Sequence, residues 1–120
     1  MLQTSIHSSS ASRILALKTA EAAHGDPGRS LIELAAKFGV APRRLGYAFL
    51  LHFGHTYRQF ALNERLAKAA ERLAVQVLPI KAIASAAGYS HVTDFHRAFR
   101  ARYGLTPRQY RIQASKEPTL

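Results

Sequence analysis

The 120-residue sequence predicts an all-α protein of seven helices, arranged as two similar subdomains joined by a long linker helix. Two observations carry this prediction. Apolar side chains recur at three- and four-residue spacing along most of the chain, and no useful length alternates with the period of two that a strand requires. The chain also repeats itself, because residues 34–60 return in looser form as residues 83–110.

Each copy of the repeat is expected to form a short helix, a glycine turn and a longer helix. Gly39 corresponds to Gly88 and Phe49 to Phe99, and the spacing between partners grows by one from the phenylalanine pair onward. The second copy therefore contains one additional residue. The further pairs are Phe53 with Tyr103, Gly54 with Gly104, Thr56 with Thr106, and Phe60 with Tyr110. This order and length are typical of a helix-turn-helix unit.

Local start and stop signals give the bounds of the seven helices. We expect capping boxes at Ser30–Glu33, Thr56–Gln59 and Thr106–Gln109, where a hydroxyl and a Glu or Gln side chain satisfy backbone amides reciprocally. Pro42 suits a first helical turn, and Ser90 is expected to cap the sixth helix. The expected ranges are 13–23, 30–39, 42–53, 56–74, 79–87, 90–103 and 107–113.

The charge of the chain favours a polyanionic partner. Lys and Arg number 17 against 7 Asp and Glu, which gives a net charge of +10. Such an excess attracts nucleic acid or an acidic membrane face. Cysteine is absent, which excludes disulfides, thiolate catalysis and thiolate zinc sites. The N-terminal residues lack the pattern of a secretory signal, and no apolar run reaches the ~20 residues of a membrane span, so we expect a cytoplasmic location.

The predicted helices divide the chain into five segments. The helix-turn-helix subdomains occupy residues 13–55 and 75–113, with the linker helix at residues 56–74 between them. Residues 1–12 are expected to be a flexible tail or linker, and residues 114–120 a C-terminal tail. The linker helix would be ~25 Å long. With the width of the flanking helices, the two units could stand about one turn of B-DNA apart, ~34 Å.

The second of the longer helices would present a polar face. If its aromatic stripe points inward, the opposite arc can reach base edges or phosphates. Arginine can pair bidentately with guanine, and threonine offers a hydroxyl and a methyl group. The candidate DNA-binding residues are Thr93, Arg97 and Arg100 on this arc, His96 on its flank, and His91 in the first turn.

The first of the longer helices is less polar on the corresponding face. Tyr47 takes the place of Arg97, and Leu50 takes that of Arg100. The candidate DNA-binding residues here are Arg43, Arg44 and Tyr47. Two alternatives remain open for Leu50 and its neighbour Leu51: they pack against the linker helix, or they form an apolar contact for a neighbouring domain or the polymerase.

Two threonines are candidate phosphate contacts. Thr56 and Thr106 are primarily helix caps, and the amides that they help to order could also face a phosphate, because a helix N-terminus favours anions. No catalytic residue, metal site or cofactor is expected. His52 and His55 lie three residues apart, whereas His91 and His96 do not stack on one helix face. No third ligand completes either pair to the set that a metal ion requires.

Fourteen anchor residues in one register lie in the second copy and directly beside it. They are Ile80, Ile83, Ala84, Gly88, Tyr89, Phe95, Arg97, Phe99, Tyr103, Gly104, Thr106, Pro107, Tyr110 and Arg111. This pattern resembles the signature of the AraC/XylS family of bacterial transcription regulators, and the resemblance extends over residues 13–111. It implies a double helix-turn-helix domain that binds promoter DNA, usually as an activator that touches RNA polymerase.

The resemblance also implies particular base-reading positions. By the family pattern these are Arg43, Gly46 and Tyr47 in the first recognition helix, and Val92, Thr93 and Arg97 in the second. Many relatives carry an effector-sensing or dimerisation domain upstream. The sequence departs from the family at Ala41, where a serine or similar cap is usual, and at Leu50 and Leu51, where polar or basic residues are usual.

Three functions follow from these observations. The leading one is a sequence-specific regulator whose two recognition helices enter successive major grooves of double-stranded DNA. The second is a nonspecific or architectural DNA binder of the same fold. The third is a protein-interaction module whose basic faces meet an acidic partner.

Overall fold

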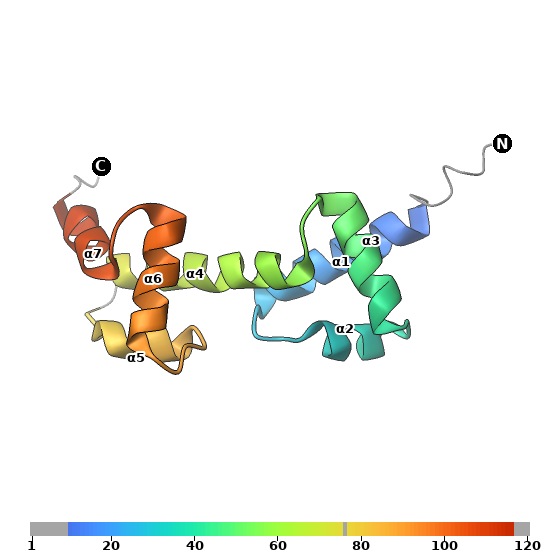
Figure 1. The fold of residues 1–120 in the computed structure, drawn as a ribbon, viewed down its shortest axis with the longest axis horizontal. Coiled ribbons are helices and arrows are strands. Elements are labelled where there is room, and N and C mark those ends of the chain that lie inside the picture. Colours follow the sequence, from blue (N-terminus) through green and yellow to red (C-terminus); the bar gives the residue numbers. More distant parts are fainter. Residues whose placement is uncertain (1–9, 76, 117–120) are drawn as a thin grey trace. The chain divides into compact units, whose positions relative to one another are not determined.

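The computed structural model describes residues 10–75 and 77–116, which form seven α-helices (Figure 1). The predicted all-α class is confirmed. The helices are α1 Ser10–Gly25, α2 Leu31–Phe38, α3 Pro42–Phe53, α4 Tyr57–Val75, α5 Ile80–Ala86, α6 Val92–Tyr103 and α7 Pro107–Lys116. Residues 1–9 of the expected N-terminal tail, and 117–120 of the expected C-terminal tail, lie outside the described residues.

The chain divides into two compact units, one ending at Glu64 and the other beginning at Arg65. The division falls inside α4, the helix that the sequence predicts as a linker. The first part of α4 therefore contributes to unit 1 and the second part to unit 2.

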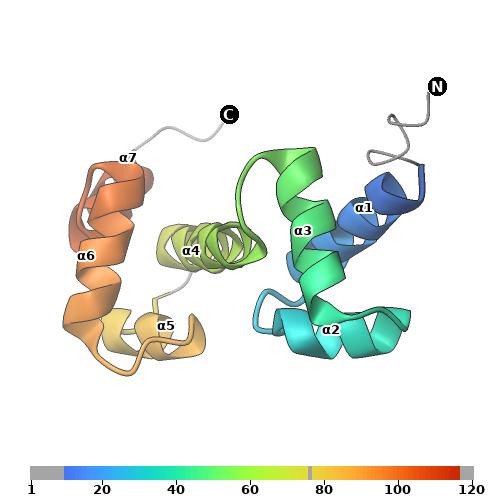
Figure 2. The same cartoon turned by 45° about the vertical axis from the view of Figure 1, so that its right-hand side comes forward.

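Unit 1 is built around α3, which packs against both α1 and α2 (Figure 1 and Figure 2). Its buried core consists of Ala23, Leu34, Ala35, Leu45, Phe49, Tyr57 and Ala61. Two side chains of α4 tie this helix to the rest of the unit. The Tyr57 hydroxyl donates a hydrogen bond of 2.6 Å to the Arg29 carbonyl, and His24 Nδ1 lies 2.8 Å from Glu64 Oε1.

In unit 2, α6 packs against both α5 and α7. The buried side chains of this unit are those of Leu66, Ala69, Ala70, Leu73, Ile83, Ala84, Ala87, Phe95, Phe99 and Pro107. Arg111 of α7 donates hydrogen bonds to the carbonyls of Leu73 at 3.2 Å and Leu78 at 2.7 Å. The Leu73 carbonyl belongs to the last turn of α4, where the helix itself leaves carbonyls unsatisfied, and Leu78 lies in the segment that leads to α5.

The predicted helix signals are largely confirmed. All three capping boxes form, with the hydroxyls of Ser30, Thr56 and Thr106 each 3.1 Å from the amide that they cap. The helices α3 and α6 end at corresponding glycines, Gly54 with φ of 80° and Gly104 with φ of 77°. These left-handed conformations reverse the chain direction and favour glycine, because a Cβ would be strained there.

Two helix starts differ from the prediction. Ser90 is not the cap of α6, because the helix begins at Val92 and His91 is the N-cap residue, with no side-chain hydrogen bond. The additional residue of the second copy lengthens the α5–α6 turn, which moves the cap past Ser90. Helix α1 begins at Ser10, before the expected start at Arg13, since serine and alanine can continue a helix that packing stabilises.

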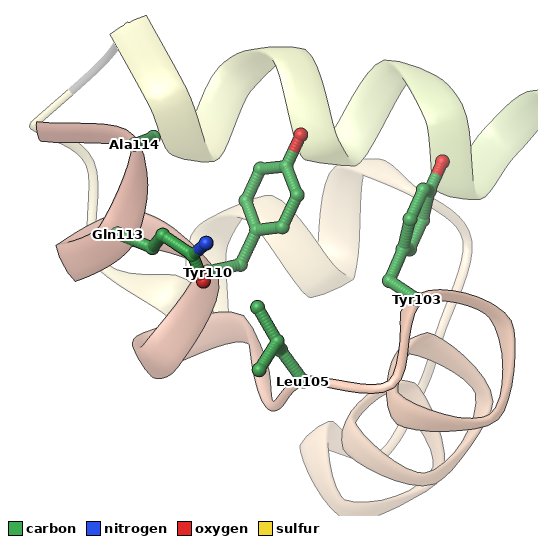
Figure 3. A pocket seen from close by; sticks show the side chains of 5 residues that line it. All are labelled: Tyr103, Leu105, Tyr110, Gln113 and Ala114. Carbon is green, nitrogen blue, oxygen red and sulfur yellow. The ribbon is translucent and has the colours of Figure 1, made fainter. Parts of the chain in front are cut away.

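The junction of α6 and α7 in unit 2 contains a pocket of about 150 Å³ (Figure 3). Its lining residues are Tyr103, Leu105, Tyr110, Gln113 and Ala114, and both tyrosine hydroxyls point toward α4. In unit 1 the place of Leu105 is taken by His55, whose ring is stacked at 6.1 Å from Phe53 and 6.0 Å from Phe60. The repeat therefore preserves the aromatic partners but not the ring between them.

Replacement of Phe49 by alanine should lower the free energy of unfolding by about 3–5 kcal/mol, because the ring is completely buried among four other rings. Urea titration followed by circular dichroism would measure this loss. The control is Ile32→Ala in the same unit, where the side chain is 69% exposed and the expected change is within about 0.5 kcal/mol. Equal effects of the two substitutions would contradict the assignment of the core.

Candidate nucleic-acid interface

Helix α3 has a buried face and an exposed face. Leu45 and Phe49 are completely buried, whereas Arg43, Arg44 and Tyr47 are exposed. Tyr47 is 64% exposed, although its phenol ring could have packed against the core. The structure therefore brings the three candidate residues of α3 together on its outward side.

The two leucines that follow are also exposed, Leu50 at 43% and Leu51 at 44%. The alternative in which they are buried against α4 is thus not observed. Instead they extend the outward face of α3 with apolar side chains.

Gly46 has a packing role in α3. A Cβ atom at this position would lie 3.1 Å from Leu31 Cδ2 of α2. This distance is shorter than ordinary van der Waals contact, so the absence of a side chain permits the close approach of α2 and α3. Gly46 therefore faces α2 and does not belong to the outward side of α3.

Helix α6 presents the polar face predicted from the sequence. Phe95 and Phe99 are completely buried, and their burial directs the opposite side outward. His91, Thr93, Arg97 and Arg100 are exposed, and Val92 is half-buried at the first turn.

His96 is placed differently from the other candidates of α6. Its side chain is half-buried, its ring centroid lies 6.3 Å from that of Phe95, and its buried Nε2 has no hydrogen-bond partner among the described residues. The ring thus lies between the outward face and the core of unit 2, and a contact of His96 with a base stays a prediction.

Arg97 is 80% exposed and lies 3.5 Å from the Asp94 carboxylate. Such an exposed pair contributes little to stability, since solvent screens it. Asp94 therefore keeps the Arg97 guanidinium near the helix surface through a weak ion pair. Exchange of the carboxylate for a nucleic-acid group as the partner of Arg97 would cost little free energy.

The hydroxyls of Thr56 and Thr106 cap α4 and α7 as predicted. Each backbone amide of these threonines also donates to a glutamine side chain, with distances of 3.1 Å to Gln59 and 3.0 Å to Gln109. A contact of either residue with a phosphate stays a prediction.

Unit 2 contains a surface hollow that the sequence analysis did not identify. This open hollow of about 440 Å³ lies between α5 and the start of α6, and is lined by Lys81, Ala84, Ser85, Tyr89, Ser90, His91, Val92 and Thr93. Three of these residues are candidate DNA contacts. The signal that could have identified Lys81 is the repeat, because Lys81 stands where the first copy has Ile32.

Tyr89 lies beneath this hollow, with its ring centroid 5.5 Å from that of Phe95. Burial raises the pKa of its hydroxyl above the ordinary value, Arg65 lowers this pKa and Asp94 raises it. The buried hydroxyl has no hydrogen-bond partner among the described residues.

The described residues do not meet the requirements of a metal site or of a membrane-spanning helix. Within residues 10–75 and 77–116, no three side chains of His, Cys, Asp or Glu gather as potential metal ligands. No helix in this part of the chain has both the length and the apolar character that crossing a membrane requires.

Each unit is a short helix-turn-helix with exposed basic residues opposite a buried apolar stripe. Two such units define a helix-turn-helix DNA-binding domain. The profile of a helix-turn-helix domain family matches residues 34–113. The chain belongs to this family, and within it to the AraC-type transcriptional regulators, which confirms the resemblance drawn from the sequence.

The curated relatives are longer than this chain. Over 81 residues it is 38% identical to YfiF of Bacillus subtilis, described as an uncharacterized HTH-type transcriptional regulator. Over 88 residues it is 33% identical to CdhR of Pseudomonas aeruginosa, an HTH-type transcriptional regulator. These alignments cover 68% and 73% of this chain, but only 26% of each relative. The chain thus spans about a quarter of these proteins.

Solved structures share the fold. A transcriptional regulator with an AraC-type DNA-binding domain from Chromobacterium violaceum superposes with a TM-score of 0.76 and 26% identity, covering 92% of this chain and 97% of that one. A DNA-binding transcriptional dual regulator from Escherichia coli superposes with the same TM-score of 0.76 at 22% identity, over 86% of this chain and 94% of that one.

Replacement of Tyr89 by phenylalanine should leave the free energy of unfolding at pH ~7 unchanged or slightly higher, because the hydroxyl has no described partner to lose. Since the pKa of Tyr89 is raised on folding, its contribution to stability is fully present below pH ~10 and is lost as the pH rises further. The variant should therefore lose less stability above pH ~10 than the wild type.

Urea titrations at both pH values would test this expectation. The matched control is Tyr47→Phe, at an exposed tyrosine, for which the expected change is within about 0.5 kcal/mol. A loss above about 1.5 kcal/mol for Tyr89→Phe at neutral pH would contradict the account, because it would indicate a hydrogen bond to the hydroxyl.

Proposed function

We propose that this chain recognises specific promoter sequences by inserting α3 and α6 into successive major grooves of double-stranded DNA. The observation that carries the proposal is the exposed polar face of α6, where Thr93 and Arg97 lie opposite the buried Phe95 and Phe99. The polar face of such a helix can approach base edges in the major groove, while the buried face fixes the rotation of the helix in the core.

Recognition would combine two kinds of contact. Lys and Arg side chains neutralise phosphates and release counterions, which supplies affinity without sequence preference. Base edges are read by the outward side chains, with Arg97 suited to a bidentate pair with guanine and Thr93 to a hydroxyl or methyl contact. The phosphate contacts fix the position of the unit, and the base contacts select the sequence.

The two recognition helices would read different features. In α3, Arg43 and Arg44 can reach phosphates or guanine, Tyr47 offers a ring and a hydroxyl, and Leu50 can contact a thymine methyl group. Because this face is less polar than that of α6, we infer that unit 2 supplies more of the hydrogen-bond discrimination.

The role of the whole protein is proposed from its relatives. Since the chain spans about a quarter of the curated regulators that it matches, the proposed regulator includes an upstream effector-sensing or dimerisation domain. It acts in the cytoplasm on nucleoid DNA, as an activator that contacts RNA polymerase.

A second candidate is nonspecific DNA binding by the same fold. The observation that favours it is the outward face of α3, which exposes two leucines in place of polar side chains. Gly46, which faces α2, adds no side chain to this face. A gel-shift series with excess random competitor DNA at fixed salt separates the two functions, because only sequence-specific complexes survive.

The replacement of Arg97 by lysine should remove base discrimination while it retains the charge. Lysine lacks the rigid planar fork with which a guanidinium fits the guanine edge, so the preference for one base pair should fall by about 1–3 kcal/mol. Binding of single-position variants of a selected duplex, measured by fluorescence anisotropy, would detect the loss.

The control for charge is Arg13→Ala on α1, an exposed arginine that is not among the candidate base contacts, and this variant should leave the base preference intact. If Arg97→Lys weakened binding to every duplex by the same factor, Arg97 would contact phosphate and the proposed base contact would be wrong.

A further inference from the structure

We propose that the hollow between α5 and the start of α6 holds a phosphate of the DNA backbone, with Lys81 as its cation, and that unit 1 has no counterpart. This inference deepens the proposed function and rests on it. It assigns to unit 2 a backbone anchor directly beside its base-reading residues.

The position of the hollow points to a backbone contact. Its lining combines Lys81 and Ser85 of α5, Ser90 of the turn, and His91, Val92 and Thr93 at the start of α6. Because His91, Val92 and Thr93 are also candidate DNA contacts, a duplex that accepts α6 in its major groove would bring the adjoining strand to the hollow. The base-reading surface and the hollow are thus one continuous surface within unit 2.

The chemistry of the lining suits a phosphate. Lys81 is exposed, and no ion pair links it to any of the described residues. Ser85 and Ser90 are exposed hydroxyl donors on the same lining, which contains no carboxylate. An ammonium group with nearby hydroxyls is complementary to a phosphodiester and reads no sequence.

The repeat provides an internal comparison. In the register of the paired glycines, Lys81 corresponds to Ile32 and Ser85 to Ala36. The N-cap residues pair His91 with Ala41, so Ser90 is the additional residue of the longer α5–α6 turn. All three residues of unit 1 are exposed, and Ile32 is 69% exposed. Unit 1 therefore presents an apolar side chain where unit 2 presents the Lys81 cation, and the methyl group of Ala36 where unit 2 presents the Ser85 hydroxyl. The Ser90 hydroxyl has no counterpart in the shorter α2–α3 turn.

The occupant should be a backbone phosphate rather than a base. Loss of a phosphate contact weakens binding to all sequences by the same factor, and it lowers the number of counterions that are released on binding. Loss of a base contact instead changes the preference at one position. Removal of Lys81 should therefore change the salt dependence of binding and leave the base preference intact, whereas replacement of Arg97 should change the base preference.

The experiment compares Lys81→Ala with Lys116→Ala, which removes the same charge from the exposed end of α7. Affinity for a mixed-sequence duplex of ~20 bp, two helical turns, is measured by anisotropy across a salt series. For Lys81→Ala, the slope of log K against log salt should become shallower by about one. Lys116→Ala and Ile32→Ala should retain the wild-type slope. Thermal unfolding checks that each variant is folded.

The outcomes separate this inference from the proposed function. If the wild type binds and Lys81→Ala keeps its slope, the phosphate site is wrong and the proposed function stands. If Lys81→Ala alters the preference at one base pair, Lys81 reads a base and the inference is wrong. An equal change with Lys116→Ala or Ile32→Ala would show that general charge or surface effects are responsible. No binding by the wild type at any salt would instead overturn the proposed function.

Discussion

The burial of an aromatic stripe fixes the rotation of each recognition helix, and the rest of the interface depends on it. Phe49 in α3 and Phe99 in α6 are completely buried, and each contacts further rings of its own unit. A helix whose apolar face is fixed in the core has only its opposite face available to a partner. The left-handed glycines at the ends of both helices then return the chain to the next helix.

The two units share this scaffold but differ in the side chains that they expose. Unit 2 combines a polar helix face with a hollow that contains Lys81, whereas unit 1 exposes Tyr47, Leu50 and Leu51 on α3 and Ile32 on α2. Two units with similar cores and different surfaces can have different roles in DNA binding, because affinity and sequence discrimination arise from different contacts. The core constrains the fold, and the outward residues are free to diverge.

Much of the fold could be predicted because its signals are local. The capping boxes and the spacing of the aromatic stripe lie within single helices. Features that depend on contacts between helices could not be predicted in this way. The proximity of Gly46 to Leu31 and the hollow around Lys81 require two helices to be placed together. The predicted cap of α6 at Ser90 was wrong, because the additional residue of the second copy lengthens the α5–α6 turn and His91 becomes the N-cap residue. The base-reading residues stay predictions, since no contact within the protein reports on DNA.

The central claim is that both recognition helices engage one duplex together. Selection of bound sequences from a random DNA pool tests it most directly, because the length of the selected site reports how many units make specific contacts. The account predicts two preferred segments whose centres lie about one helical turn apart, ~10 bp. A single preferred segment of about half a dozen base pairs, the span of one recognition helix, would contradict it.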